Sequence, residues 1–137
     1  MTVYLDTSNL VKLYVNEPDS DAIAQIVEQA DVVVTSALAY AEARATFARR
    51  RRERYLTSAE SSAAVRQLDD DWSRFVVINL GDELALSAGR LADLHALRGC
   101  DAVHLASFED LLVRCDDDDV RFSCADDRLV RAARLLA

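Results

Sequence analysis

The sequence predicts a three-layer α/β/α domain built around a central parallel sheet of four or five strands. Short β-branched runs alternate along the chain with longer segments of helical periodicity, and strands that are separated by helices pair in parallel. Gly and Pro are scarce, at three and one residues, so few tight turns are expected. The length of 137 residues suits one compact domain over residues 1–137.

Four short apolar runs are predicted to form the strands. They consist mostly of β-branched and aromatic residues, which strands favour. The runs are residues 3–5, 32–34, 76–78 and 120–122. Because each pair of runs is separated by a segment long enough for a helix, we expect helices on both faces of the sheet.

Helix start signals precede several of the longer segments. These are Asp19 or Ser20 after Pro18, Ser36 before a long alanine-rich segment that reaches the arginine run, and a capping box of Thr57 and Glu60. The helices are expected at residues 7–14, 20–30, 36 to about 52, behind the capping box, 82–97, from 101 onward and 127–136. One apolar stripe along them is Val65, Leu68, Trp72 and Phe75, and a second is Leu84, Ala88, Leu91 and Ala92.

The composition excludes several classes of protein. A net charge of −8 argues against nucleic-acid binding over the whole surface, so any attraction to RNA must be local. The three cysteines have neither the spacing nor the histidine partners of a zinc site and are expected to be reduced thiols. With no signal peptide and no apolar run of membrane-spanning length, we expect a cytoplasmic protein without a membrane partner.

Four carboxylates stand out by their position. Asp6 follows the first predicted strand and Asp126 the fourth, Asp101 begins a helix, and Glu42 lies inside an otherwise apolar helical stretch. Each acid has an ordinary alternative: the aspartates could be helix caps, and Glu42 could reach water. Open parallel sheets, however, bring their strand ends to one crevice, which favours a shared role.

Four carboxylates in one crevice repel one another, so a cation must neutralise them or some must be protonated. Oxygen ligands select hard ions, which predicts Mg²⁺ or Mn²⁺. Such a metal can activate water and stabilise charge on a phosphate under attack. Packing with a hydrogen-bonded imidazole is the expected role of His95 and of His104, although His104 lies close enough to Asp101 for joint ligation.

Four segments, in order, resemble the PIN-domain family, and most closely its VapC-like toxins. They are Val3–Ser8, a strand followed by D-[ST]-[ST]; Thr35–Glu42, in which a glutamate follows a seryl helix start; Arg98–Ala106, similar to G-x-D-A-x-H-L-A; and Phe122–Leu129, a strand followed by aspartate and R-L. A departure is Cys100, where the family usually has an aromatic residue.

The resemblance implies a PIN fold and an Mg²⁺- or Mn²⁺-dependent endoribonuclease, the toxin of a toxin–antitoxin pair. It assigns the metal and the chemistry to Asp6, Glu42, Asp101 and Asp126, with Ser8 as an assisting hydroxyl. Asp127 remains an alternative to Asp126. The implied partners are an RNA substrate, a small VapB-like antitoxin and a second copy in a homodimer.

Other functions are weighed against this one. A solitary PIN-domain RNA-processing nuclease is the main alternative, and a non-catalytic RNA- or protein-binding PIN module is a weaker one, because all four acids are present. A signalling receiver domain also places aspartates around Mg²⁺. That class requires adjacent acids and a late lysine, but Asp6 stands between Leu5 and Thr7 and the only lysine is Lys12.

RNA is expected to contact the arginine run at residues 49–52, the dense basic segment of the sequence. Arg49 and Arg52 are the chosen contacts. Arg49 lies seven residues after Glu42, on the same helix face and about 10 Å along the axis. Contact with the antitoxin, or solvated arginines that complement the helix dipole, are the alternatives.

Overall fold

The computed structural model describes residues 1–136 and confirms the three-layer α/β/α architecture with a parallel four-stranded sheet. Ala137, the last residue of the predicted domain, lies outside the described residues. The strands are β1 (Thr2–Leu5), β2 (Val32–Ser36), β3 (Val76–Ile78) and β4 (Val120–Ser123), in the order β3-β2-β1-β4. Parallel registers pair Val3 with both Val33 and Arg121. The first strand therefore lies inside the sheet, between β2 and β4.

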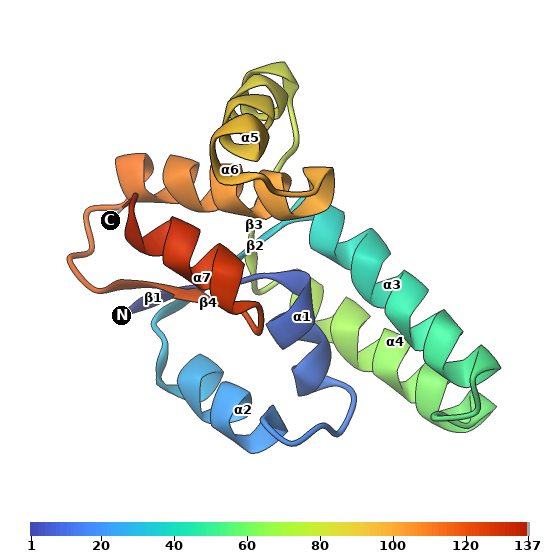
Figure 1. The fold of residues 1–137 in the computed structure, drawn as a ribbon. Helices are drawn as coiled ribbons and strands as arrows, with labels where there is room; N and C mark the ends of the chain where they lie inside the picture. The colour runs from blue at the N-terminus through green and yellow to red at the C-terminus, as the bar shows by residue number, and fades with distance from the viewer. Residues whose placement is uncertain (137) are drawn as a thin grey trace.

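Helices cover both faces of the sheet (Figure 1). They are α1 (Thr7–Leu10), continued by the 3-10 turn η1 (Val11–Leu13), α2 (Ser20–Gln29), α3 (Ala37–Arg52), α4 (Ser58–Trp72), α5 (Asp82–His95), α6 (Gly99–Arg114) and α7 (Asp127–Arg134). Helices α1 to α4 lie on one face, and α5 to α7 on the other.

Each face of the sheet has its own hydrophobic core because the side chains of a strand alternate. Val3 and Leu5 point into the core of α1 to α4, where Phe47 and Leu68 are also fully buried. Tyr4 points the other way, into the core that α5 to α7 form around Leu105. Both stripes predicted from helical periodicity pack into these two cores, although Phe75 lies just beyond the end of α4.

Helix α6 is enclosed on two sides. It packs against the sheet, and α5 lies across its outer side rather than on the sheet itself (Figure 1). A helix covered in this way must be apolar over most of its circumference. Seven of its residues are accordingly buried, including Ala102, His104, Leu105 and Phe108. This helix carries Asp101 in its first turn.

Some helix boundaries differ from those predicted. Helix α5 stops at His95 because Ala96 takes a left-handed conformation with φ of 52°, a common way for helices to end. Helix α6 then begins at Gly99, two residues before Asp101. The predicted caps Ser36 and Thr57 are confirmed, the latter within a complete capping box with Glu60.

Among residues 1–136, none of the helices combines the length and the apolar character needed to cross a bilayer.

The stability of the fold is expected to depend on the two-sided burial of α6. Leu105→Ala removes a side chain with no exposed surface and should lower the free energy of unfolding by about 2–5 kcal/mol. Leu94→Ala on α5 deletes the same atoms from a side chain that is 68% exposed, so its effect should stay within about 0.5 kcal/mol. Urea unfolding measures both. Equal losses in the two variants would contradict this account of the core.

Candidate active site

The sequence-predicted acids come together around the carboxyl edge of the sheet. Asp6 directly follows β1, and Asp126 follows β4, the neighbour of β1. Glu42 lies in the second turn of α3, which leaves β2, the other neighbour of β1. Asp101 reaches the same region from α6. Adjacent parallel strands therefore bring residues from positions 6 to 126 of the chain to one edge.

Asp6 is the buried member of the group, with 5% of its surface exposed. Its Oδ1 accepts hydrogen bonds from Ser8 Oγ at 2.6 Å and from the backbone N–H of Asn9 at 3.2 Å. Its Oδ2 accepts from the Cys124 thiol at 2.8 Å. A buried carboxyl group needs such hydrogen-bond partners. Asp6 is thus both the cap of α1 and a hydrogen-bonded carboxyl group at the sheet edge.

Glu42 is held by two donors from other elements. Its Oε1 accepts from Thr7 Oγ1 at 2.6 Å and from His104 Nε2 at 2.8 Å. Burial by itself raises the pKa of Glu42, but the hydrogen bonds from His104 and Thr7 outweigh it and the pKa is lowered. The half-buried Glu42 is therefore kept ionised, which a role as a cation ligand requires.

His104 is a positioning residue for Glu42, in line with the expected hydrogen-bonded imidazole. Its ring is buried, and its Nδ1 lies 2.9 Å from the Tyr4 hydroxyl. The pKa of Tyr4 is raised by burial, so this hydroxyl keeps its proton and can donate it to Nδ1. With this assignment at Nδ1, Nε2–H donates to Glu42. His95 instead lies at the end of α5, in a hollow beside α7.

Asp101 and Cys100 lie next to Glu42 at the start of α6. The pKa of the Cys100 thiol is raised by burial and, in addition, by the nearby negative charges of Glu42 and Asp101. Asp101 sits in the first turn of α6, where the helix dipole favours a carboxylate. Its Oδ2 lies 3.5 Å from Arg98 Nε, a pair in which the arginine is almost fully exposed.

Asp126 is the cap of α7. Its Oδ1 accepts from the backbone N–H groups of Arg128 at 2.8 Å and Leu129 at 3.4 Å, and its own N–H lies 3.3 Å from the Cys124 sulfur. Asp127 is the first residue of the helix. The ordinary capping role considered for Asp126 is thus present. Both bonds of the cap go to Oδ1 of Asp126. The choice of Asp126 over Asp127 as the fourth acid stays a prediction.

Cys124 joins Asp6 to the Asp126 backbone. Burial and the charge of Asp6 raise the pKa of this thiol to about 12, so it stays protonated and donates to Asp6. Ser8 completes the link, since its Oγ also accepts from the backbone N–H of Ala125 at 3.0 Å. Asp6 is therefore linked to the backbone just before α7 through the Cys124 thiol and the Ser8 hydroxyl.

The donor chemistry of this edge fits a hard divalent cation. Four segments bring carboxylate residues to this edge, and Glu42 is held ionised. As the side chains lie, no three His, Cys, Asp or Glu residues within positions 1–136 form a group ready to bind a metal ion. Binding would therefore require side-chain rotation, for which Asp101 and Asp126 have the freedom of partly or fully exposed groups.

The predicted RNA contacts lie apart from the acids. Arg49 and Arg52 are exposed near the end of α3. Arg49 and Arg50 line a hollow together with Glu53 and Glu60, and Arg50 also forms an ion pair with Glu17. Three carboxylates therefore surround this part of the arginine run. RNA contact at Arg49 and Arg52 stays a prediction.

Sequence reasoning missed three residues of this site. Tyr4, Thr7 and Cys124 contact the acids or their histidine, but none was singled out. Thr7 had a signal, because it stands directly after Asp6 and before Ser8 in the D-[ST]-[ST] segment. Tyr4 looks like any core residue of a strand, and its hydroxyl partner lies 100 residues away along the chain.

Comparisons with known proteins identify the family to which the chain belongs. The sequence matches the PIN domain family over residues 3–134, so the chain belongs to the PIN-domain family. Ribonuclease VapC49 of Mycobacterium tuberculosis is 41% identical over 105 residues, which cover 77% of this chain and 73% of that protein. Over the aligned residues, the chain is thus similar in sequence to a VapC ribonuclease.

Solved structures share the fold at low sequence identity. The crystal structure of VapC20 of Mycobacterium tuberculosis, described as a Sarcin-Ricin loop cleaving toxin, is 18% identical and superposes with a TM-score of 0.65 over 85% of this chain and 91% of that one. VapBC2 of Rickettsia felis, bound to a DNA fragment from the promoter, gives 0.57 at 13% identity over 90% of this chain and 100% of that one.

The hydrogen bond from Thr7 should be measurable in the titration of Glu42. Thr7→Val removes one donor and should raise the pKa of Glu42 toward its ordinary value, which carboxyl NMR in metal-free buffer can follow. Because the folded-state pKa is lowered, the ionised form stabilises the fold above the unfolded pKa, and this contribution is lost as pH falls through the folded pKa.

Thr46→Val is the matched control for this measurement. Thr46 Oγ1 donates to the backbone oxygen of Glu42 at 2.9 Å, not to its carboxylate. It should leave the pKa of Glu42 unchanged. A titration that is identical in wild type and Thr7→Val would show that Thr7 does not hold the charged form.

Proposed function

We propose that the chain is an endoribonuclease that hydrolyses RNA phosphodiester bonds with a bound Mg²⁺ or Mn²⁺, within one PIN-like domain over residues 1–137. The observation that carries the proposal is the pairing of Asp6 and Glu42, one buried and one held ionised, at the same edge of the sheet. The 41% identity to a protein named as a ribonuclease supports the choice of RNA as substrate.

Asp6, Glu42, Asp101 and Asp126 are the residues that would hold the metal. They are carboxylates on four segments around one edge, and the first three lie on or beside buried elements. When bound, the cation supplies activation of a water molecule and neutralisation of charge on the phosphate. In its absence the negative charges repel one another, so a cation should also stabilise the fold.

The remaining site residues orient the acids. Thr7 and His104 both donate to Oε1 of Glu42 and so fix this oxygen, and His104 is itself held by Tyr4. Neither donor is bonded to Oε2. In Asp6 both oxygens are held, Oδ1 by the Ser8 hydroxyl and Oδ2 by the Cys124 thiol. Ser8 is exposed, so its hydroxyl is also placed to assist the attacking water or the substrate. Arg49 and Arg52 are proposed as contacts to RNA phosphates beyond the site.

We further propose that the nuclease is a toxin controlled by a small VapB-like protein and that it acts as a homodimer. The relatives support this role, since VapC20 is described as a toxin and VapBC2 by a two-part name. An acidic site of this kind would accept an arginine from the partner through charge-assisted hydrogen bonds. A solitary RNA-processing nuclease with the same chemistry is the second candidate.

Loss of single carboxylates should abolish the chemistry and spare the fold. Asp6→Asn, Glu42→Gln or Asp101→Asn removes one ligand charge at nearly constant shape, and RNA cleavage should fall by a factor of about 10² or more. Asp93→Asn on the exposed face of α5 removes the same charge away from the site and should cleave as wild type does. Gel-based cleavage of a labelled RNA measures all four variants.

A thermal melt provides the second readout of this experiment. Mg²⁺ or Mn²⁺ should raise the melting temperature of the wild type and of Asp93→Asn, by mass action, and should raise that of Asp6→Asn less. Undiminished cleavage in EDTA would exclude the metal mechanism.

The toxin role is tested by expression in a bacterial host. The wild-type chain alone should arrest growth, Asp6→Asn should not, and co-expression of the short open reading frame next to the gene should relieve the arrest. An active chain that does not affect growth and co-purifies with no small protein would favour the solitary nuclease.

A further inference from the structure

A basic hollow lies between the end of α5 and the exposed side of α7. Its volume is about 510 Å³, and it is lined by His95, Arg128, Arg131, Ala132, Arg134 and Leu135. Within the described part of the chain, no carboxylate belongs to this lining. In a protein with 24 acidic and 16 basic residues, such a hollow is a local surface that attracts a negatively charged ligand.

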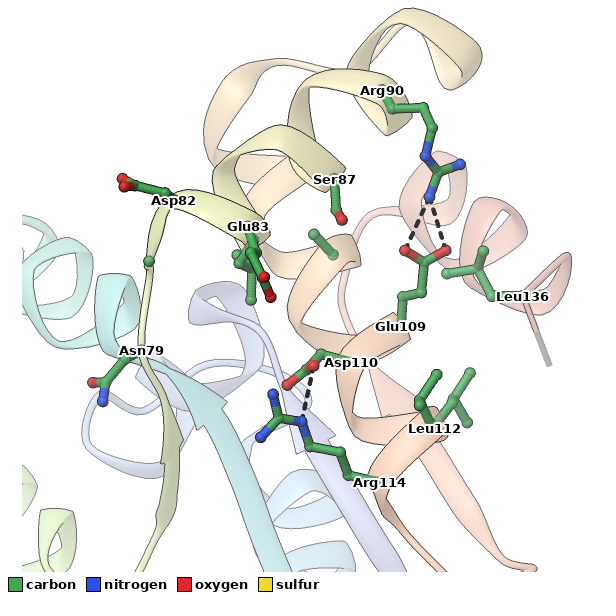
Figure 2. A pocket seen from close by; sticks show the side chains of 14 residues that line it. Asn79, Asp82, Glu83, Ser87, Arg90, Glu109, Asp110, Leu112, Arg114 and Leu136 are labelled. Atoms are coloured by element: carbon green, nitrogen blue, oxygen red, sulfur yellow. Dashed lines mark hydrogen bonds and ion pairs between the residues drawn. The ribbon is translucent and has the colours of Figure 1, made fainter.

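Other arginines that line hollows are neutralised by nearby acids. Between α5 and α6, Arg90 donates to both oxygens of Glu109 at 3.0 and 3.2 Å, and Arg114 donates to Asp110 at 3.0 Å (Figure 2). At the end of α3, Glu17, Glu53 and Glu60 surround the arginines. The α7 hollow differs from both because three arginines line it and no carboxylate does, within the described residues.

The helix geometry of α7 explains how the arginines reach the solvent. Leu129, Ala132 and Ala133 are buried against the core, which turns Arg131 and Arg134 to the opposite face. Neither of these two forms an ion pair with any residue from 1 to 136. Arg128 is fixed at the rim of the hollow, because its guanidinium donates to the carbonyl of Ala96 at 3.0 Å.

The hollow begins close to the acidic site. Asp126 caps the helix that carries the arginines, so Arg131 and Arg134 lie about 7 and 12 Å from it along the helix axis. Helices α3 and α7 run away from the edge of the sheet in different directions (Figure 1). An RNA strand that passes over the acidic residues can therefore be bound beside α7 independently of the arginine run on α3.

We propose that the α7 hollow binds phosphate groups of the RNA strand next to the cleaved bond, with Arg131 and Arg134 as the contacting residues and Arg128 at the rim. This inference rests on the proposed ribonuclease function and adds to it a second surface for the substrate, whose lining holds no carboxylate among the described residues although Asp127 lies one turn before Arg131. Arginine forks match phosphate oxygens in geometry as well as in charge. An attractive surface beside a repulsive acidic cluster keeps the strand near the site without reducing the charge that the metal requires.

The test compares two double variants in an Asp6→Asn background, where the RNA stays intact. Arg131→Gln/Arg134→Gln removes the two contacts, and Arg66→Gln/Arg74→Gln removes two exposed charges on the other side of the molecule, at and just beyond α4. A short labelled single-stranded RNA is titrated at several salt concentrations. The first variant should bind up to about tenfold more weakly at low salt and lose about 1.4 units of log–log salt slope, or 0.7 for each phosphate contact, whereas the second should match the background.

Two further measurements make each outcome decisive. Arg131→Lys/Arg134→Lys keeps the charge and should retain most of the salt slope, and thermal melts should show that all variants are folded. Unchanged RNA affinity and slope in Arg131→Gln/Arg134→Gln would overturn the inference, and weaker binding of a polyglutamate peptide by that variant would then assign the hollow to an acidic protein segment. If the background itself binds no RNA, the proposed function fails together with the inference.

Discussion

The hydrogen bond between His104 and Glu42 is the interaction on which the site depends. It joins α6 to α3 across the edge of the sheet, and the partners of the two residues add β1 through Tyr4 and α1 through Thr7. Four elements that are distant in sequence thus meet at one buried imidazole. A buried network of this kind stabilises the fold when its members are hydrogen-bonded, and here Tyr4, His104 and Thr7 each have a partner within it. The acidic edge and the packing of the two faces are therefore linked through His104.

The layers of the fold could be predicted from the sequence because the strands and helices of each layer have a local sequence signal. The valine runs identify β2 and β3, and the capping signals at Ser36 and Thr57 place the starts of α3 and α4. The boundary between α5 and α6 had no such signal. It depends on the left-handed conformation of Ala96, and alanine carries no preference for it. The sequence predicted the next helix from Asp101 onward, whereas α6 already begins at Gly99.

The candidate site could be predicted only as far as its charged residues. Asp6 and Asp126 follow strands, and Glu42 is conspicuous in an apolar segment, so their positions in the sequence are informative. The groups that orient them are neutral, and a tyrosine, a threonine and a cysteine resemble ordinary core residues until a fold brings them to a carboxylate. The basic hollow was missed for a related reason. Arg128, Arg131 and Arg134 are spaced like the polar face of any short helix, and only the position of acids elsewhere makes that face distinctive.

The enclosure of α6 divides the acids into a rigid and an adaptable set. Asp101 belongs to a helix confined between the sheet and α5, and Asp6 is continuous with the central strand, so their backbones move only if a large part of the core opens. Asp126 stands on an exposed turn before a helix of eight residues and can shift at small energetic cost. In the proposed metal site, differences in ionic radius between cations would then be absorbed mainly at Asp126. The range of divalent ions that such a site accepts would in this sense depend on α7, the element that also carries the basic hollow.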